Sequence, residues 1–339
     1  MEIRSVFTIN KKGKIKIMKF IKKLSITCSM LLIGFLVSCV GENTTNKTDN
    51  QNAYQGVNIE TIMVKHTKGE TEVNKNPQRV VTFDYGSLDI LENLGIDVLG
   101  LPKETLPKMF EKYKDSKYEN LGGLKEPDFE AINALNPELI IISGRQSDMY
   151  DKFSQIAPTI LLSIDGSKYM EDLTNNANVL GSIFGKEDIV ATKLNEIQSK
   201  ISELNTLVTS KNLNALTLLV SEGNLSAYGD KSRFGILYNS FGFKNVDETL
   251  QDSTHGQQVS FEYVVDKNPN VLFVIDRGVA TSGEGAAETV LDNDLIKSTD
   301  SYKNENIVYL DAQVWYLVSG GFNSTNSMIA EIENFMSKF

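Results

Sequence analysis

Four arginines are the residues whose placement first suggests chemistry. Lys and Arg together number 34; eight lie in the first 38 positions, and only four of the remaining 26 are arginines. Three of these four stand beside or near a glycine: Arg145, Arg233 and Arg277. A guanidinium offers a planar fork of donors and suits partly buried anions. Each could instead pair with a structural carboxylate, but the three together favour a shared anionic ligand; Arg79 is expected to be structural.

His255 and Tyr316 are the other side chains that could contact a ligand or an ion. His255 lies in the polar loop 253–257, and Tyr316 follows the only tryptophan, Trp315. A loop histidine is usually solvated and a tyrosine beside a tryptophan is usually packed, so the pattern leaves a joint metal site as an open alternative. His66 is expected at the surface.

The sequence contains no arrangement typical of an enzyme. It has no Gly-x-Ser-x-Gly nucleophile motif, no Walker phosphate loop and no His-x-x-x-His helix. Asp84 and Asp89 lack a partner base and are expected to cap helices. We therefore expect a binding protein that is not an enzyme.

A repeat relates two of the arginines. Residues 129–145 align without gaps to residues 261–277, at a constant offset of 132. Each copy consists of a short helix, an Asn-Pro turn, an apolar strand and an arginine at the strand's carboxyl end. Ligands of open α/β sheets bind at that end, so the repeat predicts Arg145 and Arg277 on two sides of a cleft. The helix of each copy also carries a matching glutamate, Glu130 and Glu262.

Short apolar runs alternate with helical stretches along most of the chain. The expected strands are 79–83, 98–101, 139–142, 159–162, 216–221, 271–275 and 307–310, after an opening hairpin over 57–64 and 66–73. The expected helices are 87–94, 128–135, 170–184, 232–241, 262–267 and 324–336. This alternation predicts the α/β class with a mainly parallel sheet.

One long helix is expected in the middle of the chain, over residues 187–208. Its apolar residues recur at spacings of three and four: Val190, Leu194, Ile197, Ile201, Leu204 and Val208. At 1.5 Å per residue it would extend roughly 30 Å, the width of a small domain. Because it lies between the two copies of the repeat, we expect it to connect two α/β units.

The first 38 residues have the pattern of a secretory signal. Eight basic residues precede an apolar run over 24–37, which is too short for a comfortable membrane span. Leu36-Val37-Ser38 then stands directly before Cys39, an arrangement that resembles a bacterial lipoprotein processing site; a chance cysteine in a plain signal peptide is the alternative. Met18 opens a signal of normal length and is suspected to be the true start.

Without that segment the chain is strongly acidic. It keeps 26 basic and 43 acidic side chains, a formal charge of −17, which suits neither nucleic acid nor an anionic membrane face. Cys28 leaves with the signal and Cys39 would carry lipid, so no thiol remains for a disulfide, a zinc site or a nucleophile.

From about residue 57 to the end, the chain resembles the iron–siderophore-binding lipoproteins of bacterial ABC importers, especially members that bind catecholates and petrobactin. The stretches that carry the resemblance are 128–137, 141–147, 232–235, 254–256, 276–277 and 315–317. The resemblance implies two Rossmann-like α/β lobes joined by a single long helix, the class III periplasmic-binding-protein fold. The ligand would be held between the lobes.

The resemblance also implies roles for single residues. Arg145, Arg233 and Arg277 would contact the catecholate oxygens of a ferric siderophore. His255 and Tyr316 would coordinate Fe(III) when the siderophore supplies only four ligands. Siderophore-bound Fe(III) is the transported ligand, and no permanent cofactor is implied.

The same resemblance implies partners and a location. Glu130 and Glu262 would dock on the membrane permease, which works with its ATPase. The protein would be a monomer anchored outside the cytoplasm by lipid on Cys39. The rivals are a receptor for haem, cobalamin or another metal chelate on the same scaffold, a divalent-metal receptor, and a surface adhesin or recruited enzyme.

The expected organisation follows from these observations. A signal peptide occupies 1–38, and the lipidated cysteine with a flexible tether occupies 39–56. The N-terminal lobe spans 57–186, the connecting helix 187–208 and the C-terminal lobe 209–339.

Overall fold

The chain divides into two compact units, Met1–Gly56 and Val57–Phe339. The computed structural model describes residues 60–250, 253 and 255–339, all of them in the second unit. The expected signal peptide, Cys39 and the tether therefore lie outside the described residues. Among the described residues, no helix is long and apolar enough to cross a bilayer.

The first part of the described chain forms an α/β lobe, which we call the N-terminal lobe. A five-stranded sheet has the order β5-β4-β3-β6-β7, and all of its strand pairs are parallel. An antiparallel hairpin, β1–β2, stands apart from it. The elements are β1 Thr61–His66, β2 Gly69–Asn74, β3 Val80–Thr82, α1 Tyr85–Asn93, β4 Gly100–Leu101, η1 Lys108–Lys114, β5 Glu119–Asn120, α2 Phe129–Ala134, β6 Leu139–Ile142, η2 Gly144–Met149, α3 Tyr150–Ser154, β7 Thr159–Leu161, η3 Gly166–Lys168 and α4 Tyr169–Phe184.

The part that follows the long helix α5 (Glu187–Lys211) forms the C-terminal lobe. Its sheet has the order β11-β9-β8-β12-β13, with β10 also paired to β8. Strands β8, β12 and β13 pair in parallel. Strand β9 pairs antiparallel with both of its neighbours, β8 and β11. The elements are β8 Asn214–Ser221, β9 Asn224–Tyr228, α6 Ile236–Asn239, β10 Lys244–Asn245, β11 Gln257–Val259, α7 Phe261–Lys267, β12 Val271–Asp276, α8 Arg277–Thr281, α9 Ala287–Leu291, α10 Asp294–Lys297, α11 Asp300–Lys303, β13 Ile307–Tyr309, α12 Ala312–Leu317 and α13 Phe322–Met336.

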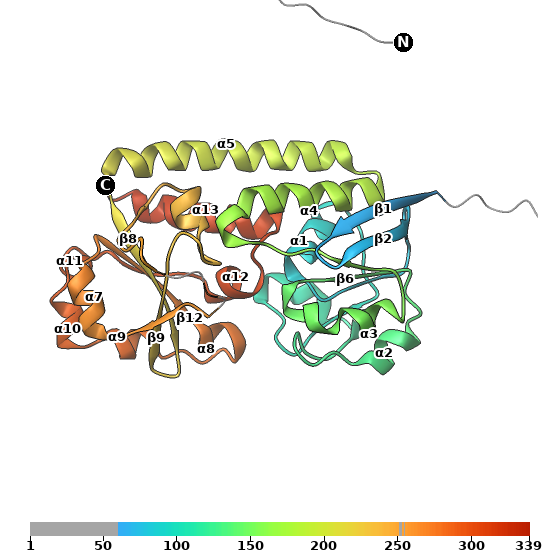
Figure 1. Ribbon diagram of the computed structural model, residues 1–339, viewed down its shortest axis with the longest axis horizontal. Coiled ribbons are helices and arrows are strands. Elements are labelled where there is room, and N and C mark those ends of the chain that lie inside the picture. Colours follow the sequence, from blue (N-terminus) through green and yellow to red (C-terminus); the bar gives the residue numbers. More distant parts are fainter. Residues whose placement is uncertain (1–59, 251–252, 254) are drawn as a thin grey trace, which may run out of the picture. The chain divides into compact units, whose positions relative to one another are not determined.

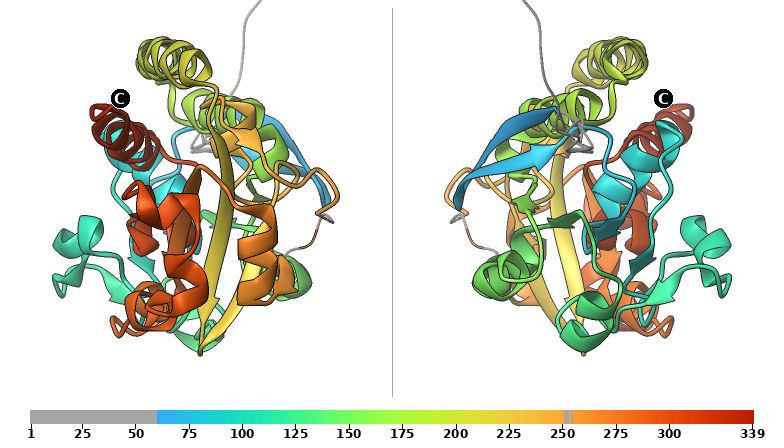
Figure 2. Two further views of the ribbon diagram at one scale, coloured as in Figure 1. Left: turned by 90° about the vertical axis from the view of Figure 1, so that its left-hand side faces the viewer. Right: turned by 90° about the vertical axis from the view of Figure 1, so that its right-hand side faces the viewer.

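Helix α5 joins the two lobes (Figure 1). Gly185 ends α4 in the left-handed conformation, and α5 begins two residues later. The expected apolar stripe faces inward: Val190, Ile197, Ile201, Leu204 and Val208 are buried, and Leu194 is partly buried. Figure 2 shows α5 nearly end-on, with α4 and α13 beside it.

One hydrophobic core continues through both lobes. It includes Leu173 and Leu180 of α4, the inner face of α5, and Ile329 and Ile332 of α13. Two smaller cores cover the outer faces of the two sheets. Separating the lobes would expose this shared core, which opposes wide opening.

The structure confirms the α/β class and both copies of the repeat. Each repeat helix, α2 or α7, is followed by an asparagine in the left-handed conformation, Asn136 (φ 46°) or Asn268 (φ 39°). A proline follows each asparagine and prevents the helix from continuing. The buried strand, β6 or β12, then runs toward the arginine.

The expected helix over 232–241 is wrong in length, because only α6 is regular. The Gly235 N–H donates to Ser232 O at 2.8 Å, which closes a tight turn before the helix. A Cβ on Gly235 would lie 2.4 Å from Asp230 O and 2.7 Å from Gly166 O. Residues 232–235 therefore form a tight turn packed against Gly166, and the helix begins only at Ile236.

The antiparallel strand β9 was not expected either. Glu222 and Gly223 both have positive φ (51° and 81°), which is the signature of a two-residue hairpin turn matched to the twist of its strands. This turn reverses the chain directly after β8.

Candidate functional site

Arg145 and Arg233 meet at the backbone carbonyl of Tyr316. The Nη2 atom of Arg145 donates to this oxygen at 2.5 Å, and the Nη2 atom of Arg233 donates to it at 2.7 Å. Arg145 comes from the N-terminal lobe, and the other two residues come from the C-terminal lobe. The structure therefore brings Arg145, Arg233 and Tyr316 into contact, and Arg277 bonds the phenol of Tyr316 as a fourth expected ligand-binding residue.

Local hydrogen bonds fix the turn that carries Arg145. Ser143 donates to the Gln146 side-chain oxygen through its backbone N–H and its hydroxyl, both at 3.0 Å. The Gln146 amide donates in turn to Leu124 O at 2.6 Å. Gln146 is fully buried, so this turn is rigid where β6 ends and the arginine begins.

Local structure also fixes the turn that carries Arg233. The Ser232 hydroxyl donates to Gly229 O at 2.6 Å, and the Gly235 N–H donates to Ser232 O at 2.8 Å. The Arg233 guanidinium then lies 4.3 Å from the centroid of the Tyr316 ring. Such a cation–π contact orients the guanidinium plane against the ring.

The phenol of Tyr316 is surrounded by positive charge. Burial acts to raise its pKa, but hydrogen bonding from Arg277 and the charges of Arg233, Arg277 and Arg145 outweigh burial, and the pKa of Tyr316 is lowered. A lowered pKa favours the phenolate, which is a hard anionic oxygen ligand. The chemistry of this group therefore suits a hard cation such as Fe(III).

Arg277 stands at the start of α8, directly after β12. Its Nη1 atom donates to the Ser221 hydroxyl at 3.1 Å and lies 4.0 Å from the Glu222 carboxylate. The Glu222 side chain is 88% exposed, so this ion pair is weak and readily exchanged for another anion. Arg277 also bonds the Tyr316 phenol, so both it and Arg145 act on this tyrosine.

Arg145 and Arg233 have no carboxylate partner within ion-pair distance among the described residues. Burial and the neighbouring Arg145 charge lower the pKa of Arg233 to about 10, which leaves it positively charged at neutral pH. Burial raises the pKa of Asp84, the N-cap of α1, although bonds from Ser87 and the charge of Arg145 act to lower it. Partly buried cations without a counter-ion are costly unless an anionic ligand completes the site.

His255 is exposed and is not joined to this cluster by any contact among the described residues. Its backbone N–H donates to the Ser253 hydroxyl at 3.3 Å. The next residue, Gly256, lies so close to Tyr228 that a Cβ would come within 2.6 Å of that ring. Gly256 therefore packs against Tyr228, while the His255 side chain is exposed to solvent. In the described part of the chain, no three His, Cys, Asp or Glu side chains form a metal cluster.

Tyr228 is a site residue that the sequence did not reveal. It is buried at the end of β9, and burial raises its pKa to about 12, with Arg233 and Arg277 acting in the opposite direction. Its ring packs edge-on against Phe234, with centroids 4.9 Å apart. A tyrosine at the end of a strand, directly before Gly229, could have indicated a site residue. The sequence did not predict this strand, so the signal was missed.

Glu130 and Glu262 are exposed in the first turns of α2 and α7. They occupy matching positions of the repeat, one on each lobe. Arg79 is structural, since it donates to the carbonyls of Leu135 and Asn136. His66 is half-buried and is not fully at the surface, because it hydrogen-bonds Thr71 and packs against Tyr150.

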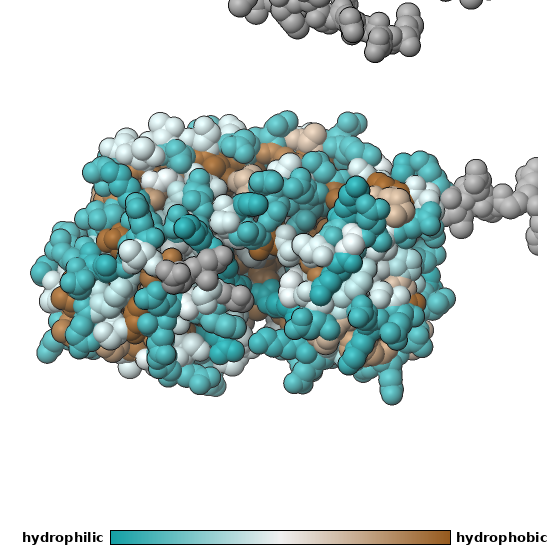
Figure 3. Space-filling view, viewed as in Figure 1, coloured by the Kyte–Doolittle hydropathy of each residue, from teal (hydrophilic) through white to brown (hydrophobic). Residues whose placement is uncertain are grey.

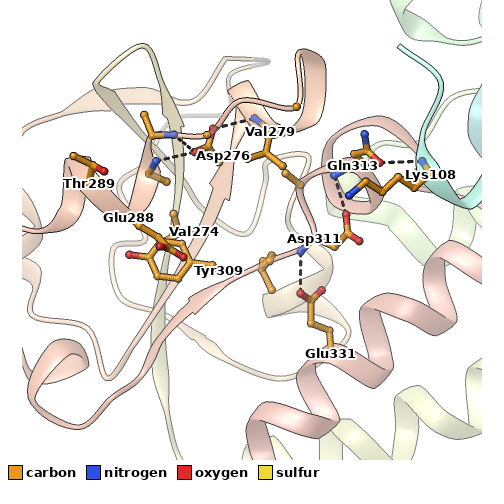
Figure 4. A pocket seen from close by; sticks show the side chains of 16 residues that line it. Lys108, Val274, Asp276, Val279, Glu288, Thr289, Tyr309, Asp311, Gln313 and Glu331 are labelled. Atoms are coloured by element: carbon orange, nitrogen blue, oxygen red, sulfur yellow. Dashed lines mark hydrogen bonds between the residues drawn. The ribbon is translucent and has the colours of Figure 1, made fainter. Parts of the chain in front are cut away.

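A cavity of about 640 Å³ lies beside β13 (Figure 4). None of the five expected ligand-binding residues lines it. Two of the carboxylates that line it, those of Asp276 and Glu331, are already bonded to neighbouring elements. Asp276 accepts four backbone N–H bonds that cap α8 and the start of α9. Glu331 accepts from the Trp315 indole at 2.7 Å and from the Asp311 N–H at 2.8 Å. These acids hold α8 and α12 in place.

The space-filling view shows where a ligand could enter. Figure 3 shows a largely hydrophilic face with a hollow between the two lobes. Two α/β lobes joined by one long helix, with arginines from both lobes around one tyrosine, define a solute-binding protein.

The chain belongs to the periplasmic binding protein family, whose model matches residues 80–314. It is 42% identical to the petrobactin-binding protein YclQ of Bacillus subtilis over 321 residues, which are 94% of this chain and 100% of the relative. The crystal structure of YclQ matches with a TM-score of 0.81 and 45% identity, covering 83% of this chain and 100% of YclQ. The periplasmic catecholate-siderophore-binding protein VctP of Vibrio cholerae matches with a TM-score of 0.77 and 35% identity, covering 81% of this chain and 100% of VctP.

Proposed function

We propose that this protein is the substrate-binding component of an ABC importer and that it binds a ferric catecholate-type siderophore between its lobes. The observation that carries the proposal is the pair of partly buried arginines that lack a carboxylate partner among the described residues. They surround a tyrosine whose pKa is lowered. The binding functions named for YclQ and VctP support the same ligand class.

The arginines account for selection of an anionic chelate. Ferric catecholates carry negative charge on the oxygens that bind iron. Each guanidinium that bonds such an oxygen contributes roughly 1.5–3 kcal/mol, and arginines from both lobes act on one ligand. A neutral chelate would leave these cations unpaired.

Tyr316 and His255 are proposed as iron ligands for siderophores that fill only four coordination positions. Tyr316 already has the electrostatic environment that favours its phenolate. His255 would have to move inward from its exposed loop. Fe(III) is part of the cargo here, and no resident cofactor is proposed.

Fluorescence titration tests the ligand class. Trp315 is 1% exposed and adjoins Tyr316 in α12, so a ferric complex bound at the arginines should quench its emission. Ferric bis- and tris-catecholates should quench, and a ferric hydroxamate should not. Tight hydroxamate binding without catecholate binding would overturn the proposal; haem or cobalamin binding would favour the rival receptor.

Spectroscopy tests the two iron ligands separately. Tyr316→Phe and His255→Ala should each shift the visible charge-transfer band of the bis-catecholate complex. Neither variant should alter the band of a tris-catecholate, which fills all six positions itself. An unchanged bis-catecholate band in either variant excludes that side chain as a ligand.

Glu130 and Glu262 are proposed to dock on arginines of the permease, which is driven by its ATPase. They are exposed, they belong to different lobes and they occupy equivalent repeat positions. The double variant with Glu130→Ala and Glu262→Ala should abolish uptake and keep ligand affinity unchanged. Exposed acids outside the repeat, such as Glu126 and Glu284, provide the matched control pair.

Lipid on Cys39 is proposed to anchor the protein as a monomer at the outer face of the cell membrane. The proposal rests on the signal pattern and on the lipoproteins among the relatives. Cys39→Ala should release the protein from membranes without changing its ligand affinity. The proposed lobes are 57–186 and 209–339, and limited proteolysis should cut first in the tether, 39–56.

A further inference from the structure

The segment that follows Tyr316 belongs to the C-terminal lobe by sequence but is bonded to the N-terminal lobe. It comprises residues 317–325, and we call it the strap. The carboxylate of Asp89, on α1, accepts the backbone N–H of Asn323 at 3.1 Å and that of Ser324 at 2.7 Å. A carboxylate of one lobe therefore caps the first turn of a helix, α13, in the other.

Tyr169, at the start of α4, makes a second attachment. Its hydroxyl accepts the backbone N–H of Gly320 at 2.9 Å and hydrogen-bonds the Thr325 hydroxyl at 2.8 Å. Tyr169 is 2% exposed and Thr325 is fully buried. One phenol oxygen thus joins the middle and the last residue of the strap to the N-terminal lobe, where water does not compete.

Two glycines allow the strap to lie closer to the N-terminal lobe than residues with a Cβ could. A Cβ on Gly320 would lie 2.4 Å from the side chain of Ile164, and one on Gly321 would lie 2.2 Å from a carboxylate oxygen of Asp89. Gly320 also has φ 96°, a conformation that favours glycine. The strap is therefore seated directly on the N-terminal lobe and cannot slide along it.

The strap continues directly from α12, which carries Tyr316. Asp311 caps the other end of α12, and Glu331 holds Trp315 within the C-terminal lobe. Arg145 bonds the Tyr316 carbonyl from the N-terminal lobe. Tyr316 is thus held from both lobes, and it lies one residue before the strap begins.

We propose that Asp89 and Tyr169 are positioning residues, which hold Tyr316 at the iron through the strap and so favour siderophores that leave a coordination position open. The inference rests on the proposed function. Neither residue touches the ligand. A tetradentate catecholate needs the phenolate of Tyr316, whereas a hexadentate one does not, so only the first should depend on the strap.

Tyr169→Phe is the most direct test, because it removes one oxygen and keeps the ring. The variant should lose about tenfold or more in affinity for the ferric bis-catecholate, since the buried Gly320 N–H loses its acceptor and the Thr325 hydroxyl keeps only its bond to Gly321 O. Its affinity for the tris-catecholate should stay within about threefold, and the bis-catecholate charge-transfer band should shift. Tyr302→Phe, on α11 and 43% exposed, is the matched control and should change neither.

Asp89→Asn gives a second, independent variant, in which one of the two acceptor oxygens becomes a donor. It should show the same selective loss for the bis-catecholate. Equal affinities and identical bands in wild type and both variants would overturn the inference while the proposed function stands. Equal losses for both complexes would show a general structural role and would also overturn it. Wild-type protein that binds neither complex would overturn the proposed function itself.

Discussion

Arg145 and Arg233 come from different lobes and donate to the same acceptor, the backbone carbonyl of Tyr316. Two like charges approach one another only where something negative offsets their repulsion. The carbonyl offers a partial charge, so it orients both groups without neutralising them. Since neither guanidinium has a carboxylate partner among the described residues, both can still bind an anionic ligand.

Replacing Arg233 should separate ligand binding from folding. Arg233→Gln should weaken binding of a ferric catecholate about 10- to 150-fold, because a charge-assisted bond of roughly 1.5–3 kcal/mol is lost. The apo protein should unfold at nearly the same temperature, since no ion pair is broken. Fluorescence titration and thermal unfolding make the comparison, with Lys231→Gln, an exposed neighbour, as control. Unchanged affinity would remove Arg233 from the site.

Asp89 should make stability depend on pH in an unusual direction. Burial raises its pKa from 3.8 to about 6, against bonds from Ser324 and Asn323, and Glu92 adds to the increase. The folded state therefore binds this proton more tightly than the unfolded state does. The stabilising contribution is complete below about pH 3.8 and is lost as the pH rises through about 6.

A variant isolates this contribution from that of other groups. The free energy of unfolding of wild type minus that of Asp89→Asn should fall by up to about 3 kcal/mol between pH 4 and pH 7, at 1.36 kcal/mol per pKa unit. Urea unfolding at several pH values measures the difference. A difference that stays constant across this range would show that Asp89 has an ordinary pKa.

The sequence was sufficient for features that depend on local patterns. The gap-free repeat predicted α2, α7, β6 and β12, and the apolar stripe predicted the inner face of α5. The scarcity of arginine selected Arg145, Arg233 and Arg277, and the structure brings all three to Tyr316. Each of these signals is carried by neighbouring residues or by a fixed spacing.

Features that depend on contact between the lobes could not be predicted. Asp89 was expected to cap a helix, but the helix it caps lies more than 230 positions further along the chain. In the sequence, Tyr169 is an ordinary aromatic residue at the start of a helix. Only the fold shows that its hydroxyl bonds Gly320. The sequence predicted a helix over 232–235, whereas the structure has a turn there. The turn packs against Gly166, which lies in the other lobe. Contacts between residues that are distant in the sequence leave no local pattern from which they could be predicted.

Asp247 should be among the most stabilising acids of the C-terminal lobe. Burial acts to raise its pKa, but bonds from Thr249, Tyr263 and Lys267 outweigh burial and lower it. The Tyr263 hydroxyl donates at 2.8 Å and the Lys267 ammonium lies at 3.0 Å. With a lowered folded pKa, its contribution is present above about pH 3.8 and is lost as the pH falls.

Asp247→Asn should therefore lower the free energy of unfolding by roughly 1.5–3 kcal/mol at pH 7, the usual range for hydrogen bonds to a charged group. The loss should shrink toward pH 3, because the unfolded chain then binds the proton that the folded carboxylate does not bind. Asp266→Asn, an exposed acid on the same helix as Tyr263, is the control for charge alone. An equal effect at pH 3 and pH 7 would contradict the assignment.

Gly166 sets the distance between the lobes beside Arg233. A Cβ there would lie 2.1 Å from Ser232 O and 2.5 Å from the Cα of Arg233, and these are backbone atoms that cannot rotate away. Gly166→Ala should lower the free energy of unfolding by about 1–3 kcal/mol through overpacking, and should weaken ligand binding by displacing Arg233. Gly144→Ala, whose Cβ would meet its nearest atom at 3.8 Å, should not be destabilised in the same thermal unfolding assay.

Ligand binding should change the separation of the lobes only slightly. Helix α5 is continuous from Glu187 to Lys211, and one hydrophobic core runs through both lobes beneath it. The strap adds a second attachment at Asp89 and Tyr169, so any opening must break buried hydrogen bonds as well as expose apolar surface. Small-angle scattering of the protein, with and without a ferric catecholate, should give nearly the same radius of gyration. Tyr169→Phe should show a larger change on ligand addition than wild type, because its free form is less firmly closed. A large change in wild type would mean that neither α5 nor the strap limits the motion of the lobes.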